Sequence, residues 1–213
     1  MKLIDHSVRE FTTNLDSASP APGGGSASAV SASMGTALSR MVGHLTIPKK
    51  KFKQLDESLQ NQITEHHEAL KDIKRRTLEL VDEDTEAFNG IMKAIKMPKD
   101  TEMEKSERRK ALRKATLRAT EVPLMIAREA ETALKKVELL AEHGNAHAIS
   151  DIGVGALMLY AGLEGAILNV KINLGGLDDD DFKASCTEET ASLLESGRKH
   201  RDHILETVNR RMK

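Results

Sequence analysis

The sequence predicts an all-α fold, and three observations carry that prediction. Apolar residues recur at helical spacing over long stretches of the chain. Aromatic residues make up only 2% of its 213 residues, so the core must be built from Leu, Ile, Val, Ala and Met, which suits closely packed helices rather than a β-rich fold. Neither a repeat nor an inter-domain linker is evident. We therefore expect one domain, 1–213, formed as an up-and-down bundle with two long helices and a central buried helix.

Six helices are expected in chain order, at residues 5–17, 26–46, 54–96, 102–142, 146–173 and 187–211. The first is short and amphipathic, with Asp5 or Ser7 as its cap. The following segment SPAPGGG, residues 19–25, is expected to form a turn or loop. The second helix is rich in Ala, Ser and Gly, and these small side chains let another backbone approach closely.

The third and fourth helices are the two long ones. The third ends before Pro98, because the residue that precedes a proline disfavours helical geometry. The fourth contains Pro123, which has no N–H and is expected to kink this helix or to split it in two. Ser185 and Glu188 have the spacing of a capping box at the start of the last helix.

The fifth helix is the most apolar segment, with Glu164 as the only charged residue between Ile152 and Leu168. A helix that is apolar on all sides is buried or spans a membrane. This helix falls short of the ~20 clean apolar residues that a span needs, so we expect the central helix of a soluble bundle, with no membrane attachment. Glu164 is expected to pair with a basic residue. The apolar and small-residue surfaces of the helices 26–46 and 146–173 favour a homodimer, unless one protomer uses both surfaces internally.

Composition narrows the classes of partner and compartment. The chain carries 32 basic and 33 acidic residues, a net charge of −1, so no global field favours nucleic acid or an anionic membrane. Cys186 is the single cysteine, so no intrachain disulfide is possible. The N-terminal residues do not form a signal peptide. A cytoplasmic protein is expected.

Asp84 is the most informative residue, because it lies within the apolar stripe of the third helix. It is four residues from both Leu80 and Phe88, which belong to that stripe. A carboxylate turned inward is usually paired, protonated or functional. Asp84 is therefore a candidate general acid/base with a raised pKa, and the alternative is a structural Asp bound to a Lys, an Arg or a helix cap. The acidic neighbours on other faces are expected to be solvated: Asp82, Glu83 and Glu86.

Two further patterns predict ligand contacts. Gly23, Gly24, Gly25 and Ser26 precede or open the second helix, where free N–H groups can hold a carboxylate or phosphate, although a plain turn is the alternative. A narrow stripe on the fifth helix has a small-residue floor and polar ends, formed by Asp151, Gly155, Gly162, Ala166, Asn169 and Asn173. Asp151 and Asn169 are roughly 27 Å apart at ~1.5 Å per residue, so the two ends contact one long ligand or serve different sites. The alternative for the stripe is helix packing on the glycines.

Other motifs argue against several chemistries. The histidine pairs 143/147 and 200/203 have metal-like spacing, but no cysteine or carboxylate completes either set, so we expect no metal site. Neither a nucleophile elbow nor a dinucleotide fingerprint is present. The basic run at 49–53 is expected to be a solvated loop or to attract an anionic tail on a substrate.

Four stretches together resemble a known family. They are APGGGSASAV (21–30), VDEDTEAFNGIMKA (81–94), EVPLMIAREA (121–130) and GNAHAISDIGVGALMLYAGLEGAILNVKINL (144–174). The chain resembles the cyclodeaminase/cyclohydrolase family of tetrahydrofolate one-carbon enzymes over nearly its whole length. One departure is His147, where this family is expected to have Asn or another polar residue.

The resemblance implies an all-helical, tight homodimer that takes a tetrahydrofolate derivative as substrate and requires no metal or redox cofactor. It implies that Asp84, in the motif Asp-x-x-Ala-Phe, is the catalytic carboxylate. The expected substrate-binding residues are Gly23, Gly24, Gly25, Ser26, Glu121, Asn145, Asp151, Asn169 and Asn173.

Three functions remain open from the sequence. The first is formiminotetrahydrofolate cyclodeaminase, which forms 5,10-methenyltetrahydrofolate and ammonia by general acid/base catalysis. The second is methenyltetrahydrofolate cyclohydrolase, which interconverts the methenyl and 10-formyl forms. The third is a non-catalytic helical dimer that binds folate or a partner helix.

Overall fold

The computed structural model describes residues 2–213, and within them the secondary structure is entirely helical. The α-helices are α1 (Val8–Leu15), α2 (Gly24–Thr46), α3 (Glu57–Ile95), α4 (Glu102–His143), α5 (Ile149–Leu174) and α6 (Asp180–Arg211). Three short 3₁₀ helices are η1 (Leu3–Asp5), η2 (Phe52–Gln54) and η3 (Ala146–Ala148). The predicted all-α class is confirmed.

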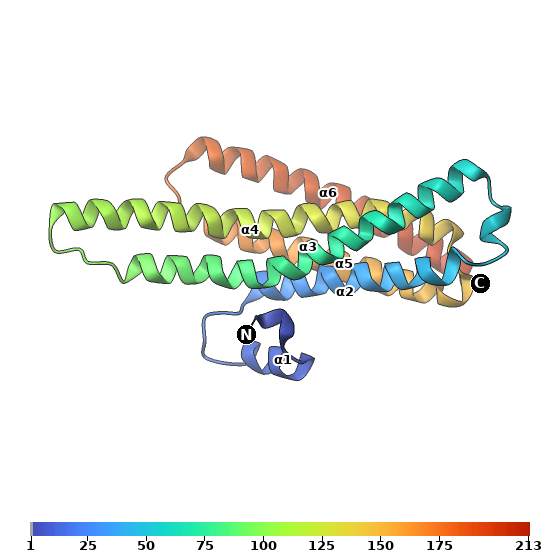
Figure 1. Cartoon of the computed structure of the whole chain (residues 1–213). Helices are drawn as coiled ribbons and strands as arrows, with labels where there is room; N and C mark the ends of the chain where they lie inside the picture. Colours follow the sequence, from blue (N-terminus) through green and yellow to red (C-terminus); the bar gives the residue numbers. More distant parts are fainter. Residues whose placement is uncertain (1) are drawn as a thin grey trace.

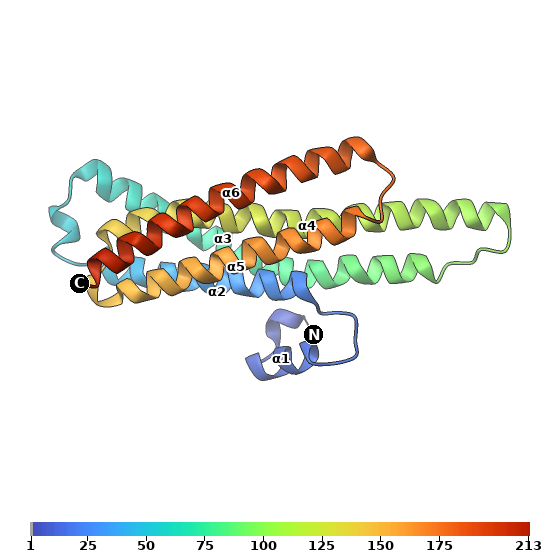
Figure 2. The same cartoon turned by 180° about the vertical axis from the view of Figure 1, so that it is seen from behind.

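Helices α2 to α6 run roughly along one long axis, and α5 packs against α2, α4 and α6 (Figures 1 and 2). The two long helices, α3 and α4, form a hairpin whose far end extends beyond the rest of the bundle (Figure 1). Helix α1 lies beside the bundle and has no buried residue. This is the predicted up-and-down bundle, in which α5 contacts three other helices.

Close packing of α2 on α5 depends on small residues, as the sequence predicts. A Cβ atom on Gly35 would lie 2.6 Å from the carbonyl oxygen of Gly155, and one on Gly162 would lie 2.8 Å from that of Ser28. Both contacts are with backbone, which cannot give way cheaply. The main chains of α2 and α5 therefore approach as closely as they do only because glycine occupies these positions.

Helix α5 is buried on one side only, which corrects the prediction that it is buried all round. Its inward face contributes fully buried side chains such as Ile152, Leu159 and Leu163 to the main core. Its opposite face leaves large apolar side chains 48–76% exposed: Val154, Leu157, Leu168 and Ile172. Glu164 on this face is exposed and has no ion-pair partner among residues 2–213, so the predicted pairing is absent from the protomer.

One stretch, Ala146–Leu174, is long and apolar enough to cross a membrane by length and composition alone. Half of its most apolar window is buried inside the bundle, and core helices of soluble proteins meet the same criterion. The absence of membrane attachment stays a prediction.

Helices α1, α3 and α5 each begin three residues later than predicted, and three further differences concern α2, α4 and α6. Helix α2 begins at Gly24 rather than Ser26. Helix α4 runs unbroken through Pro123, so of the two predicted alternatives, a kink or a split, the split is wrong. Helix α6 begins at Asp180 rather than Thr187, because the Asp179 carboxylate accepts a hydrogen bond from the Phe182 amide and caps the helix about two turns earlier.

Two capping predictions are settled by the same contacts. Ser7 is the cap of α1 and forms a capping box with Glu10, so Asp5 is not the cap. Ser185 and Glu188 lie inside α6 and form no capping box, because the helix has already begun at Asp180.

Candidate active site

A cavity of about 240 Å³ lies where the N-terminus of α2, the middle of α3 and the C-terminal part of α5 meet. It is lined by Pro20, Ala21, Gly23, Gly24, Gly25, Asp84, Phe88, Ala119, Asn169, Ile172 and Asn173. Six predicted site residues from distant parts of the sequence therefore surround one small space. Larger hollows, of about 500 and 470 Å³, lie along the α3–α4 hairpin and at the opposite end of the bundle.

The carboxyl group of Asp84 lies directly against the N-terminus of α2. A Cβ atom on Gly25 would lie 2.0 Å from Oδ1 of Asp84, so only glycine allows this approach. The Ser26 hydroxyl is 3.0 Å from Oδ2. The helix end that the sequence predicts as a ligand-anion site thus already holds an anionic group of the protein itself.

Ser26 allows Asp84 to be stable in either protonation state. Its hydroxyl is fully buried and lies 3.0 Å from the Val81 carbonyl oxygen and 3.1 Å from the Thr85 hydroxyl, besides the carboxyl. When Asp84 is ionised, the Ser26 hydroxyl can donate to it. When Asp84 is protonated, the Ser26 hydroxyl can instead donate to the Val81 carbonyl and accept a hydrogen bond from the O–H of the carboxyl group. Neither state leaves a buried polar atom without a partner.

The pKa of Asp84 is raised above its ordinary value. Burial is the largest cause, because it removes water from the ionised form, and hydrogen bonds from Ser26 oppose it only partly. No Lys or Arg among residues 2–213 forms an ion pair with this carboxyl. A shielded carboxyl with a raised pKa is suited to take up and release a proton.

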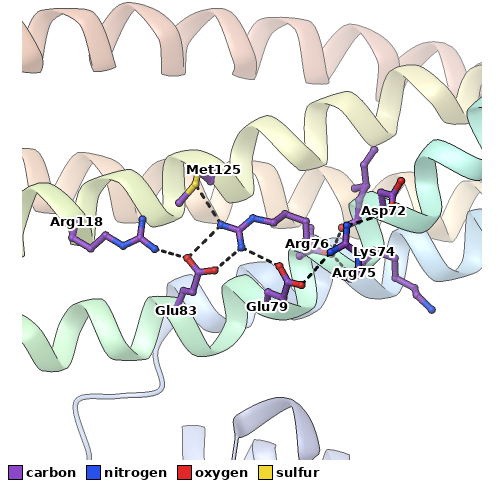
Figure 3. A network of polar contacts seen from close by, with 10 residues as sticks. Asp72, Lys74, Arg75, Arg76, Glu79, Glu83, Arg118 and Met125 are labelled. Atoms are coloured by element: carbon purple, nitrogen blue, oxygen red, sulfur yellow. Dashed lines mark hydrogen bonds and ion pairs between the residues drawn. The ribbon is translucent and has the colours of Figure 1, made fainter.

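Two of the three neighbouring acidic residues, Asp82 and Glu83, are bound rather than solvated, which corrects the prediction for them, whereas Glu86 is exposed as predicted. Glu83 accepts hydrogen bonds from Arg76, at 2.5 Å, and from Arg118, and both arginines hold its pKa below the ordinary value (Figure 3). Asp82 accepts the backbone N–H of Leu3 at 2.6 Å. Arg76 and Arg118 are thus engaged by Glu79 and Glu83 (Figure 3). Neither arginine forms an ion pair with Asp84.

Two amide side chains of α5 complete the polar lining. Asn169 donates to the Gly165 carbonyl at 2.8 Å, one turn earlier in its own helix. Asn173 donates to the Ala119 carbonyl of α4 at 2.6 Å. Neither amide oxygen accepts a hydrogen bond from residues 2–213, so both have an acceptor available for a ligand.

Pro123 explains why the Ala119 carbonyl can hold Asn173. In an unbroken helix this carbonyl would accept the N–H of residue 123, four positions later, but proline has no N–H. The Asn173 side chain supplies the missing donor. The proline is thereby tolerated inside α4. The Ala119 carbonyl, which lacks its backbone donor, in turn orients the Asn173 side chain in the cavity.

Apolar side chains close the remaining walls. Phe88 lies one turn after Asp84 on α3, and Ile172 lies on α5 between the two asparagines. Sequence analysis places Phe88 in an apolar stripe but does not assign it to a site. Its spacing of four from Asp84 is the signal that could have assigned it.

Four predicted site residues do not line this cavity. Ser26 takes part only through its hydrogen bond to Asp84, and the other three lie elsewhere. Glu121 is exposed on α4, where its carboxylate lies 4.0 Å from Arg118. Asn145 caps η3 at the other end of the bundle by accepting the His147 amide. Asp151 lies in the first turn of α5, also at that far end.

The fold and this cavity define a class of protein. It is an all-helical bundle that presents one shielded carboxyl, two amides and an aromatic wall to a small ligand group. Sites of this composition position a ligand by a few polar contacts inside an apolar setting.

The chain belongs to the formiminotransferase-cyclodeaminase family, which it matches over residues 7–192. It is 40% identical to a methenyltetrahydrofolate cyclohydrolase of Methylorubrum extorquens, over 96% of both chains. It is 35% identical to the formimidoyltransferase-cyclodeaminase of Gallus gallus over 98% of its own length, which spans 38% of that longer protein. It is similar in structure to a formiminotetrahydrofolate cyclodeaminase of Thermotoga maritima, with a TM-score of 0.83, 27% identity and 96% coverage of both chains. The predicted family is confirmed.

Proposed function

We propose that this chain acts on the one-carbon group that tetrahydrofolate carries between N5 and N10, with Asp84 as the general acid and base. The observation that carries the proposal is the Asp84 carboxyl, which is partly buried in the cavity and bound only by hydrogen bonds that suit both protonation states. Relatives that match nearly the whole chain are named as a cyclohydrolase and a cyclodeaminase, which supports the same chemistry. Formiminotetrahydrofolate cyclodeaminase is the first candidate activity.

In the cyclodeaminase reaction, the formimino group on N5 is protonated on its nitrogen, N10 attacks its carbon, and a C–N10 bond forms. The ionised Asp84 takes the proton that N10 loses. It then gives this proton to the amino group of the tetrahedral intermediate, the C–N bond breaks, and ammonia leaves with the bonding pair. The 5,10-methenyl bridge remains as a cation. One carboxyl that accepts and then donates is typically worth ~10²–10⁴ in rate.

The other cavity residues have positioning roles in this proposal. The free amide oxygens of Asn169 and Asn173 accept N–H groups of the pterin, and Phe88 packs against its ring. Holding N10 against the carbon supplies a proximity effect that complements proton transfer. Ser26 keeps the Asp84 carboxyl oriented through both transfers. No metal or redox cofactor is part of this scheme.

Methenyltetrahydrofolate cyclohydrolase is the second candidate, and the 40% identity to a cyclohydrolase over 96% of both chains favours it. Here water attacks the methenyl carbon while Asp84 accepts its proton. Asp84 then gives this proton to N5 as the C–N5 bond breaks, and the hydroxyl group of the intermediate releases its own proton to water as the formyl C=O forms, so that 10-formyltetrahydrofolate and one proton result. The same carbon and the same carboxyl serve both reactions.

A second copy of the chain completes the protein in this proposal. The cavity of about 240 Å³ lies below the roughly 300–1,000 Å³ of typical ligand pockets, so it holds the reacting end of a folate but not all of it. Ile172, at its rim, is 76% exposed and belongs to the exposed apolar stripe of α5. Helix α2, packed beside it, exposes Met34, Met41 and Leu45. Pairing these faces in a cytoplasmic homodimer removes apolar surface from water.

The test is Asp84→Asn, assayed with 5-formiminotetrahydrofolate and with 5,10-methenyltetrahydrofolate by following the methenyl chromophore. The chromophore appears in a cyclodeaminase and disappears in a cyclohydrolase. The matched control is Glu86→Gln, a carboxyl on an exposed face of the same helix. We expect a loss of ~10²–10⁴ in turnover for the first variant only. Near wild-type turnover of Asp84→Asn refutes the assignment, and folate binding without turnover in the wild type supports the non-catalytic alternative.

A further inference from the structure

We propose a second binding site, for a small aromatic carboxylate, at the end of the bundle opposite to Asp84. A cavity of about 470 Å³ lies there, between the loop that follows α2 and the junction of α4 with α5. Its lining is Thr46, Lys49, Lys51, Phe52, Leu55, Glu142, His143, Gly144, Asn145, Ala146, His147 and Arg211. This cavity gathers the basic run and the Gly-Asn-x-His segment, neither of which contributes to the Asp84 cavity.

The charge of this cavity is positive and is not neutralised within it. Lys49, Lys51 and Arg211 line it, and no carboxylate among residues 2–213 forms an ion pair with any of them. The one lining carboxylate, Glu142, already accepts hydrogen bonds from Arg210 at 3.0 Å and from Thr207 at 3.0 Å. An anionic group is therefore what the lining lacks.

Arg211 is a fixed part of this positive wall. Its guanidinium donates to the Gly144 carbonyl at 2.6 Å and to the Ala141 carbonyl, both at the C-terminus of α4. These acceptors carry no formal charge, so they hold the side chain in place while the C-terminal end of α4 and the nearby Glu142 offset its charge only in part. A pre-positioned guanidinium binds a carboxylate with less loss of side-chain freedom than a mobile one.

The floor of the cavity is apolar. Phe52 is 6% exposed and belongs to the hydrophobic core, and Leu55 packs beside it. An aromatic floor under a cationic rim matches a ligand with a flat ring and a carboxylate. The cavity volume is within the range of about 300–1,000 Å³ that small-molecule sites occupy.

This site is separate from the Asp84 cavity. Helix α5 connects the two, and the distance from its start at Ile149 to Asn169 is about 30 Å at ~1.5 Å per residue. A small ligand cannot reach both within one protomer. The proposal therefore does not depend on which folate reaction the chain catalyses.

The experiment is calorimetric titration of the full-length protein with benzene-1,4-dicarboxylate. The neutral benzene-1,4-dicarboxamide tests the need for charge, and inorganic phosphate tests whether an anion alone suffices. The site variant is Lys49→Gln/Lys51→Gln, and the matched control is Lys50→Gln/Lys53→Gln, which removes the same charge from the same loop outside the cavity. All four lysines are exposed, so both variants are expected to fold.

We expect saturable binding of the dicarboxylate to the wild type and to the control variant. Binding to the site variant should be about ten-fold weaker, and folate turnover should change in neither variant. The proposal is overturned by an absence of saturable binding, by equal losses in both double variants, or by equal binding of the dicarboxamide or of phosphate. Should the site variant unfold, loss of wild-type binding with added salt takes its place as the test, and salt-independent binding overturns the proposal.

Discussion

Replacing Gly25 by alanine tests whether the position of the Asp84 carboxyl controls activity. The new Cβ atom would lie 2.0 Å from Oδ1, 2.5 Å from Cγ and 2.6 Å from Oδ2 of Asp84. Ordinary van der Waals contact begins at 3.4 Å, so Oδ1 must move by about 1.4 Å, the difference of 3.4 and 2.0. The carboxyl is the end of a short side chain, so it can turn away while the helices stay in place.

The expected result is a large loss of activity with little loss of stability. A displacement of about 1 Å can cost ~10²-fold in rate, and full loss of acid/base catalysis costs ~10²–10⁴-fold. Alanine in place of glycine favours a helix by roughly 0.5–1 kcal/mol, which offsets part of the steric cost. A carboxyl that turns toward water is less desolvated, so the pKa of Asp84 should fall.

The two preceding glycines provide matched controls in the same segment. A Cβ atom on Gly23 would meet only the Pro20 carbonyl oxygen, at 3.8 Å, and one on Gly24 would lie 3.1 Å from the Asn169 amide nitrogen. We expect no effect of Gly23→Ala and an intermediate effect of Gly24→Ala, mainly on KM. The measurements are kcat, KM and the pH–rate profile for each alanine variant, with circular dichroism to establish folding. Wild-type kcat in folded Gly25→Ala would refute the reasoning.

Three further predictions concern stability, positioning and assembly. Because burial raises the pKa of Asp84, its ionisation lowers the free energy of unfolding, and wild-type stability falls as pH rises from the ordinary carboxyl pKa through the raised one. Over that range Asp84→Asn should become increasingly more stable than wild type. A difference in unfolding free energy between the two proteins that is the same at all pH values would contradict this. Pro123→Ala restores a backbone N–H that competes with Asn173 for the Ala119 carbonyl, so KM should rise about five-fold, which corresponds to ~1 kcal/mol, without loss of stability. Asn173→Ala added to Pro123→Ala should raise KM no further. Additive effects of the two substitutions in a double-mutant cycle would disprove the coupling. Leu168→Glu, on the exposed stripe of α5, should convert a dimer into a monomer in sedimentation velocity, whereas Val8→Glu on α1, 69% exposed, should not; an unchanged species for Leu168→Glu excludes that face as the interface.

Local patterns predicted the fold and the central residue of the site because each depends on spacing within one helix. The stripe that contains Leu80 and Phe88 places Asp84 on the inward side of α3 without any knowledge of its neighbours. Small residues of α2 similarly predict a close helix contact, which the structure confirms at Gly35. Helix boundaries failed where a competing cap, such as Asp179, lay earlier in the chain.

Predictions that depended on the axial position of a residue along its helix failed for a physical reason. A stripe on α5 groups Asp151 with Asn169 because both point in the same direction, but angular position says nothing about height along the axis. Of the residues in this stripe, Asn169 and Asn173 line the cavity with Asp84. Asn145 and Asp151 lie at the far end, so shared direction is a necessary condition for a common site and not a sufficient one.

One more contact of the site could have been sought from the sequence by asking which backbone carbonyl groups lack a hydrogen-bond donor. A proline inside a helix removes the donor for the carbonyl four residues earlier, so Pro123 alone shows that the Ala119 carbonyl needs another partner. Which side chain supplies that partner depends on how α5 packs against α4, and only the structure identifies Asn173. The proline thus marks a point where two helices exchange a polar contact beside the cavity. A proline inside a continuous helix is therefore a signal to search the neighbouring helix for a side chain that donates to the carbonyl group left without its backbone donor.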